Sequence, residues 1–355
     1  MRYLVILLTA ACLMTAGSAE SGPSPSPVKV EIVKTERGYQ LLRGGEPYTV
    51  RGAGMGVDDI ERFASHGGNS IRTWSTTRPQ QDTRALLDAA QAHGVSVALG
   101  LAMAPERRGF DYDDREAVAA QFESMRAEVL KYRDHPALLL WVIGNELNHH
   151  YTNPRVYDAV NAVAKMIHEL DPNHPTTTTT SGYKPEVNAE ILARAPALDF
   201  ISFQMYGSIF ALRERLARAG FDQPFVVTEW GAIGYWEMEK TDWGVPFETT
   251  SSEKADTFLR AYRDVLQPLE GQLIGSYVFF WGQKQERTPT WFGMLTEDGR
   301  KTEVVDVMHR TNMGVDADYK SMVLGGMRSA LADGWGGSMI ATDLQDVLFG
   351  TPEPV

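Results

Sequence analysis

The chain has 355 residues and a formal net charge of −12. This acidic balance argues against a nucleic-acid partner, which would require a basic face, and it makes a strongly anionic polysaccharide a less favourable substrate. The length allows one large domain or two small ones, and a single domain is expected because no linker-like segment interrupts the middle of the chain.

Residues 1–19 have the pattern of a secretory signal peptide. Arg2 is followed by an apolar run over residues 3–14 and then by Gly17-Ser18-Ala19, a small-x-small cleavage signal. The run is too short to span a bilayer, so no integral membrane span is expected. The protein is therefore predicted to be secreted or periplasmic, with cleavage after Ala19.

The only cysteine, Cys12, lies within this predicted signal peptide. Lipidation of Cys12 is the alternative to simple cleavage, but Thr9 stands where a lipobox normally has Leu. Cleavage after Ala19 leaves no cysteine, which excludes disulfides, cysteine nucleophiles and thiolate metal sites from the mature chain. Residues 20–27, rich in Pro and Ser, are expected to form an extended linker.

Residues 28–312 repeat one theme, a short apolar run followed by a segment with helical periodicity. Such alternation is typical of βα units around a parallel sheet. The eight predicted strands are Thr49–Gly54, Ser70–Trp74, Ser96–Leu101, Leu138–Asn145, Thr176–Ser181, Phe200–Tyr206, Phe225–Glu229 and Ser276–Trp281. Helices are predicted near 57–66, 80–93, 112–134, 154–170, 185–195, 208–219, 253–267 and 302–310.

Eight βα units indicate an α/β protein with a closed (β/α)8 TIM barrel as its single catalytic domain, with an open doubly wound sheet as the alternative. Before the barrel, residues 28–48 are expected to form a short hairpin under its floor. Residues 313–355, rich in Gly and Met, show no clear periodicity, and no structure is predicted for this tail.

Two predicted strands end in glutamate, Glu146 after the fourth strand and Glu229 at the end of the seventh. Catalytic groups of such barrels lie at the carboxyl ends of the strands, and strands four and seven face each other across the ring. Two facing carboxyls suit glycoside hydrolysis, in which one group donates a proton to the leaving oxygen and the other attacks the anomeric carbon or activates water.

Four further residues at strand ends fit supporting roles in binding a sugar. Asn145 can hydrogen-bond the 2-hydroxyl, a contact that strengthens in the transition state. The charge of Arg72 can keep Glu229 ionised. Tyr206 can orient Glu229, and Trp281 offers an apolar face on which a pyranose can stack.

The motifs Trp141-x-x-Gly-Asn-Glu146 and Thr228-Glu-Trp-Gly231 resemble glycoside hydrolase clan A, and the catalytic barrels of family 2 glycosidases are the nearest likeness. Segments 51–52, 68–72, 135–136 and 292–300 carry the same likeness. The resemblance implies that Glu146 is the acid/base and that Glu229 is the nucleophile. It also implies that Asn145 is the partner of the 2-hydroxyl and that Arg72 supports the nucleophile. Family 2 enzymes normally carry a jelly-roll and an immunoglobulin-like domain before the barrel, and this chain is expected to contain neither.

Two other positions are expected to contact substrate. Gln204 stands where many relatives have Asn or His, and the difference is expected to alter contacts near the nucleophile. Trp74 is placed to line a subsite. Adjacent His149 and His150 would point apart without a third ligand, so neither a metal nor a cofactor is expected.

These observations predict a retaining β-glycoside hydrolase whose partner is a β-linked oligo- or polysaccharide. A β-glucan transglycosidase is the first alternative, since both activities share the covalent intermediate. A non-catalytic carbohydrate-binding or export protein is the second, and a metal-dependent hydrolase the third. The sequence indicates neither the sugar nor the oligomeric state.

Overall fold

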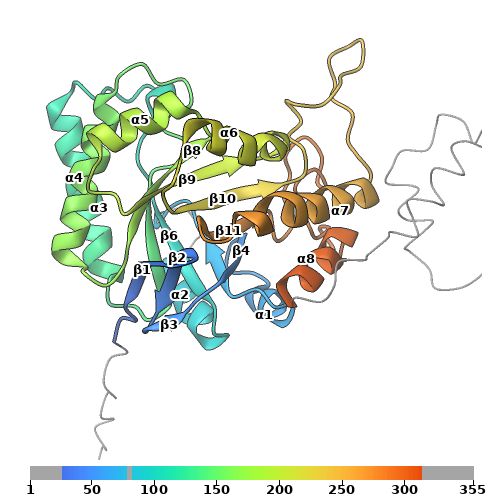
Figure 1. The fold of residues 1–355 in the computed structure, drawn as a ribbon, viewed down its shortest axis with the longest axis horizontal. Helices are drawn as coiled ribbons and strands as arrows, with labels where there is room; N and C mark the ends of the chain where they lie inside the picture. The colour runs from blue at the N-terminus through green and yellow to red at the C-terminus, as the bar shows by residue number, and fades with distance from the viewer. Residues whose placement is uncertain (1–25, 78–81, 314–355) are drawn as a thin grey trace, which may run out of the picture.

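The computed structural model describes residues 26–77 and 82–313. The predicted signal peptide, most of the predicted linker and the tail beyond residue 313 lie outside these ranges. Within them, eight parallel strands close into a barrel with helices around it (Figure 1), so the predicted (β/α)8 fold is confirmed. No helix of the described part is long and apolar enough to cross a membrane.

The barrel strands follow the predicted order, and the first and last strands are neighbours. They are β4 (Val50–Gly54), β5 (Ser70–Arg72), β6 (Ser96–Leu101), β7 (Leu138–Ile143), β8 (Thr176–Ser181), β9 (Phe200–Met205), β10 (Phe225–Gly231) and β11 (Leu273–Phe279). The last strand lies earlier in the chain than predicted: it begins at Leu273 and ends at Phe279, whereas the sequence predicted a strand from Ser276 to Trp281.

The helices also follow the sequence periodicity. They are α1 (Ile60–Ser65), α2 (Thr83–Ala92), α3 (Arg115–Tyr132), α4 (Arg155–Leu170), α5 (Pro185–Arg194), α6 (Leu212–Ala219), α7 (Ser251–Arg260) and α8 (Glu303–Met313). Shorter turns are η1 (Glu106–Arg108), η2 (Gly207–Ala211), η3 (Ala261–Leu266) and η4 (Gln267–Leu269). Gly94 and Gly220 follow α2 and α6 with positive φ of 68° and 62°, the left-handed conformation that ends a helix.

A small antiparallel sheet covers the amino-terminal end of the barrel. It consists of β1 (Val30–Thr35), β2 (Gly38–Arg43) and β3 (Glu46–Pro47), and it confirms the predicted hairpin. The turn between β1 and β2 is bound to the loop before β11, where Tyr39 N donates to Gly271 O at 2.6 Å. A Cβ added at Gly38 would lie 2.2 Å from that same oxygen, so only glycine fits there.

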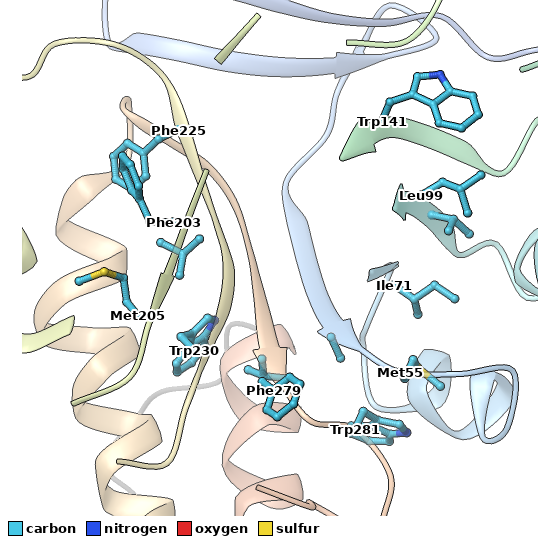
Figure 2. Packing of buried hydrophobic residues seen from close by; sticks show 14 of the residues in the cluster. Met55, Ile71, Leu99, Trp141, Phe203, Met205, Phe225, Trp230, Phe279 and Trp281 are labelled. Carbon is cyan, nitrogen blue, oxygen red and sulfur yellow. The ribbon is translucent and has the colours of Figure 1, made fainter. Parts of the chain in front are cut away.

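Apolar side chains fill two layers. The outer layer lies between strands and helices, and Figure 2 shows ten of its members labelled, among them Ile71, Leu99, Trp141 and Trp230. The inner layer joins the barrel interior to the floor sheet and includes Leu41 and Tyr277. All threonines of the run Thr176–Thr180 are buried, which agrees with their prediction as a strand.

The contact between Gly38 and Gly271 generates a stability prediction. Gly38→Ala is expected to lower the free energy of unfolding by about 3 kcal/mol, because it adds an overpacked methyl to a residue with φ of 115°. Gly45→Ala is the matched control, since φ there is 83° and nothing lies within 4 Å of the added Cβ. It is expected to cost only the backbone strain of about 1–2 kcal/mol. Equal losses in urea unfolding would contradict this account.

Candidate active site

Glu229 lies within β10 at the carboxyl end of the barrel, and its side chain accepts hydrogen bonds on both oxygens. Oε1 accepts from Arg72, from Trp74 Nε1 at 2.7 Å and from Gln204 Nε2 at 2.9 Å. Oε2 accepts from the Tyr206 hydroxyl at 2.7 Å. The residue is only 6% exposed. These donors fix the direction of the carboxylate and stabilise its charge, since hydrogen bonds to the charged form favour it.

Arg72 is fully buried at the end of β5 and links two parts of the site. One guanidinium nitrogen pairs with Glu229, and the other donates to Asn145 Oδ1 at 2.5 Å. The guanidinium also lies 5.0 Å from the centre of the Trp74 ring, within the range of a cation–π contact. The placement of Arg72 beside Glu229 therefore agrees with the sequence prediction.

Asn145 has its amide orientation fixed by two donors. Its Oδ1 accepts from Arg72 and from Gln204 Nε2, the latter at 2.7 Å. With both donors on the oxygen, the amide nitrogen Nδ2 is left to act as a donor toward the cavity. Gln204 thereby connects Asn145 to Glu229, the predicted nucleophile.

Glu146 follows β7 in a tight turn. Gly144 has φ of 73°, and a Cβ there would lie 2.6 Å from the Leu147 side chain, so glycine is required. Glu146 itself has φ of 50°, an uncommon conformation for a residue with a side chain. Its backbone is held on both sides, because its N–H donates to Thr179 O at 3.0 Å and its carbonyl accepts from Arg107.

The two carboxyls have different electrostatic surroundings. Burial raises the pKa of Glu146, the charge of Glu229 raises it further, and Arg107 opposes the shift. Burial and the same Glu229 charge hold the pKa of the Tyr206 hydroxyl well above its ordinary value. Tyr206 therefore remains a donor to Glu229, while Glu146 is the carboxyl of the pair that favours the protonated form.

Both glutamates line one cavity of about 860 Å³ at the carboxyl end of the barrel. This volume falls in the range of small-molecule sites. Asn145, Gln204 and Tyr206 form its polar base. Its apolar and outer walls contain Trp74, Tyr183, Tyr235, Trp236, Phe279 and Phe280, together with Arg108, Lys184, Arg215, Lys284 and Glu286.

The prediction for Trp281 is wrong. Trp281 is 2% exposed and does not line the cavity, and its ring packs edge-on against Phe63 of α1 at 5.2 Å. Figure 2 shows it among the core residues, beside Met55. Because β11 ends at Phe279, Trp281 lies beyond the strand, where its backbone N–H donates to Gly54 O at 3.1 Å. The aromatic wall is formed instead by Phe279 and Phe280, together with Trp74.

Two other residues of the site, Arg107 and Trp236, could not be identified from the sequence or were given little weight. Arg107 contacts Glu146 from η1, and no local signal marks it, because η1 is placed by contacts with distant loops. Trp236 is 51% exposed on the loop after β10 and lines the cavity. An exposed tryptophan soon after a catalytic strand is the signal that could have identified it.

A second hollow, of about 1060 Å³, lies at the opposite end of the barrel between the floor sheet and α8. It is larger than the cavity around Glu146 and Glu229, and Glu36 and Glu270 are among its lining residues. It lies at the amino-terminal end of the strands, whereas the catalytic groups of such barrels lie at the carboxyl end. Among residues 26–77 and 82–313, no group of three or more His, Cys, Asp or Glu side chains is arranged to hold a metal ion.

Comparison with known proteins identifies the type of barrel. Residues 81–238 match the TIM barrel domain of glycosyl hydrolases family 2. The β-glucuronidase structure of Dictyoglomus thermophilum superposes with a TM-score of 0.63 at 18% identity, covering 83% of this chain and 55% of that one. A family 2 β-galacturonidase from Eisenbergiella tayi superposes with a TM-score of 0.62 at 16% identity, covering 82% of this chain and 55% of that one. The resemblance to a family 2 glycosidase barrel is thus confirmed, and the chain spans about half the length of these structures.

A different likeness covers the end of the chain. Residues 293–355 match the Prismane/CO dehydrogenase family. Carbon monoxide dehydrogenase 1 of Methanosarcina mazei is 38% identical over 136 residues, which cover 36% of this chain and 21% of that protein. The protein of the same name from Methanosarcina acetivorans is 62% identical over 71 residues, which cover 20% of this chain and 11% of that protein. The chain thus spans about a fifth or less of these relatives. Residues 293–355 contain no cysteine, the residue that holds iron–sulfur clusters.

The electrostatics of the site generate a prediction about Glu146. Glu229→Gln is expected to lower the pKa of Glu146, because it removes a like charge, and Arg107→Gln is expected to raise it, because it removes an opposite one. Titration of carboxyl ¹³C resonances by NMR would follow both changes. Arg107→Lys is expected to shift the pKa less than Arg107→Gln, and Arg108→Gln, the neighbouring cation, is the matched control. Shifts of the opposite sign would contradict the assignment.

Proposed function

We propose that this chain is a retaining β-glycoside hydrolase that acts on β-linked oligo- or polysaccharides through a covalent glycosyl-enzyme intermediate. The observation that carries the proposal is the unequal environment of the two glutamates. Glu229 accepts several hydrogen bonds and pairs with Arg72, whereas the pKa of Glu146 is raised by burial and by the charge of Glu229. One ionised and one protonated carboxyl are what the double-displacement mechanism requires.

In the first step, Glu229 attacks the anomeric carbon while Glu146 donates its proton to the departing glycosidic oxygen. The bond from the anomeric carbon to that oxygen breaks, and an ester to a Glu229 oxygen forms. As Glu229 becomes an ester it loses its negative charge, so its hydrogen bonds from Arg72 and Tyr206 weaken. The pKa of Glu146 then falls, because the neighbouring negative charge is gone. Glu146 can then act as a base.

In the second step, Glu146 removes a proton from water, which attacks the anomeric carbon and releases Glu229. In this proposal Asn145 donates from Nδ2 to the 2-hydroxyl of the bound sugar, a contact that strengthens in the transition state. The bonds from Arg72 and Gln204 to Oδ1 support this role, because they leave Nδ2 as the available donor. The aromatic wall of Trp74, Phe279 and Phe280 supplies apolar surface for the sugar ring. If a sugar hydroxyl replaces water, the same intermediate gives transglycosylation.

The comparisons support this proposal at the level of the barrel. Proteins that share the fold include β-glucuronidases and a β-galacturonidase, which act on β-linked uronic acids according to their names. The present chain has cations on the cavity wall, Arg108, Lys184 and Arg215, that are compatible with such substrates. Export through a signal peptide at residues 1–19 remains a prediction from the sequence.

The roles of the two glutamates predict different mutant behaviour. Glu146→Gln is expected to reduce kcat/KM by about 10²–10⁴-fold on substrates with poor leaving groups, the usual contribution of a general acid. The loss should be much smaller with a dinitrophenyl glycoside, which needs no proton to depart. Glu229→Gln is expected to abolish turnover of both substrates and to prevent labelling by a cyclitol aziridine. Steady-state kinetics and peptide mass spectrometry provide the measurements.

Glu286→Gln is the matched control, because Glu286 lines the same cavity but pairs with Lys284. It is expected to change kcat/KM less than about threefold, as a surface ion pair contributes little. Full activity in either Glu146→Gln or Glu229→Gln, on a substrate that the wild type cleaves, would refute the catalytic proposal. Chromatography of products from an oligosaccharide series separates the alternatives, since longer products indicate transfer and only shorter ones indicate hydrolysis.

A further inference from the structure

The loop between β10 and α7 carries an unusual series of exposed apolar side chains. Trp236 is 51% exposed, Trp243 77%, Val245 52% and Phe247 55%. In Figure 1 this segment is the golden loop that projects from the body of the barrel beside α7. Exposed large apolar side chains gathered on one loop mark a binding surface more often than isolated ones do.

The middle of this loop is a formed hairpin, residues 239–247, here called the Trp243 hairpin. Lys240 and Pro246 form an antiparallel bridge. Thr241 N donates to Val245 O at 2.8 Å, and Phe247 N donates to Glu239 O at 3.0 Å. The hairpin therefore holds Trp243 at its turn by its own hydrogen bonds, which reduces the entropy lost when a ligand binds.

Both ends of the loop are bound to other parts of the barrel mouth. The Glu237 carboxylate accepts from the backbone N–H groups of Gly207, Ser208 and Gly234 at 2.8–3.1 Å. At the other end, Glu248 pairs with Lys254 and accepts from Thr290 Oγ1 at 2.9 Å. The Trp243 hairpin is thus anchored to loops that follow β9 and β11.

The loop is continuous with the cavity. Trp236 lines the cavity that contains the two glutamates and packs edge-on against Tyr206 at 5.2 Å. Gly234 allows this position, since a Cβ there would lie 2.4 Å from the Trp236 ring. Trp243 is seven positions after Trp236 in the chain, so their Cα atoms lie within about 25 Å of each other. A ligand longer than a single sugar can reach from one to the other.

The hairpin suits a sugar chain better than a protein partner. Two aromatic side chains cover about 150–250 Å² each, well below the ~800 Å² per partner of a standard protein interface. Exposed polar residues, among them Lys240 and Asp242, flank Trp243 and can bind hydroxyls while the indole face contacts a pyranose. We propose, building on the function above, that the Trp243 hairpin is a distal subsite for a β-linked polysaccharide chain whose end lies in the cavity.

Affinity electrophoresis tests this subsite without relying on turnover. Native gels containing laminarin, hydroxyethylcellulose or arabinoxylan serve as probes. At least one polysaccharide is expected to retard the wild type and Glu229→Gln equally, and Trp243→Ala is expected to lose most of that retardation. Leu192→Ala, an apolar residue 40% exposed on α5, is the matched control and should be retarded like the wild type. The subsite is overturned if none of the polysaccharides retards the wild type, or if Trp243→Ala is retarded as strongly as the wild type.

Kinetics and sedimentation separate this inference from the proposed function. Trp243→Ala is expected to reduce kcat/KM about tenfold on the polysaccharide that retards the protein, equivalent to ~1.4 kcal/mol. The kcat/KM of the same variant on an aryl monoglycoside is expected to stay unchanged. Equal effects on both substrates overturn the subsite but leave the hydrolase intact. Retardation that depends on Trp243 in a chain without turnover overturns the hydrolase and supports the subsite. Conversion of a dimer to a monomer by Trp243→Ala, with retardation unchanged, assigns the hairpin to self-association and overturns the subsite.

Discussion

The pairing of Arg72 with Glu229 is the interaction on which the site depends. The side chain of Arg72 is fully buried and that of Glu229 is 8% exposed, so neither charge is solvated by bulk water. Isolated charges at such positions would cost several kcal/mol each, and only a partner with additional hydrogen bonds compensates for that cost. Asn145 and Gln204 provide those bonds, which is why four side chains from separate strands have one mutually determined arrangement.

This arrangement also makes the two carboxyls unequal. Glu229 lies among donors and a cation, while Glu146 lies in a turn where burial and the field of Glu229 disfavour its charge. Different environments around two identical titratable groups are the usual way in which one site contains both an acid and a nucleophile. The two side chains are chemically identical, so the difference arises from their positions, Glu229 within β10 and Glu146 in the turn after β7.

The sequence predicted the barrel well, because apolar runs and helical periodicity depend on local order along the chain. It also placed Arg72 and Tyr206 beside Glu229, since strand ends converge at one edge of a closed barrel. The prediction for Trp281 was wrong because β11 ends two residues earlier than expected, and the Trp281 ring is buried against Phe63 of α1. The contact from Arg107 to Glu146 and the form of the Trp243 hairpin depend on loop packing, which residue type alone does not determine.

Closure of the ring has a consequence for how the molecule is assembled. The first and last barrel strands are neighbours, and the Ser70 and Tyr277 hydroxyls, 207 residues apart in the chain, meet inside the barrel at 2.9 Å. Arg72 and Glu229 are themselves 157 residues apart. Contacts of such long sequence separation form late and slowly, because much of the chain must first be ordered. The carboxyl pair is therefore arranged only after strands far apart in the chain have joined.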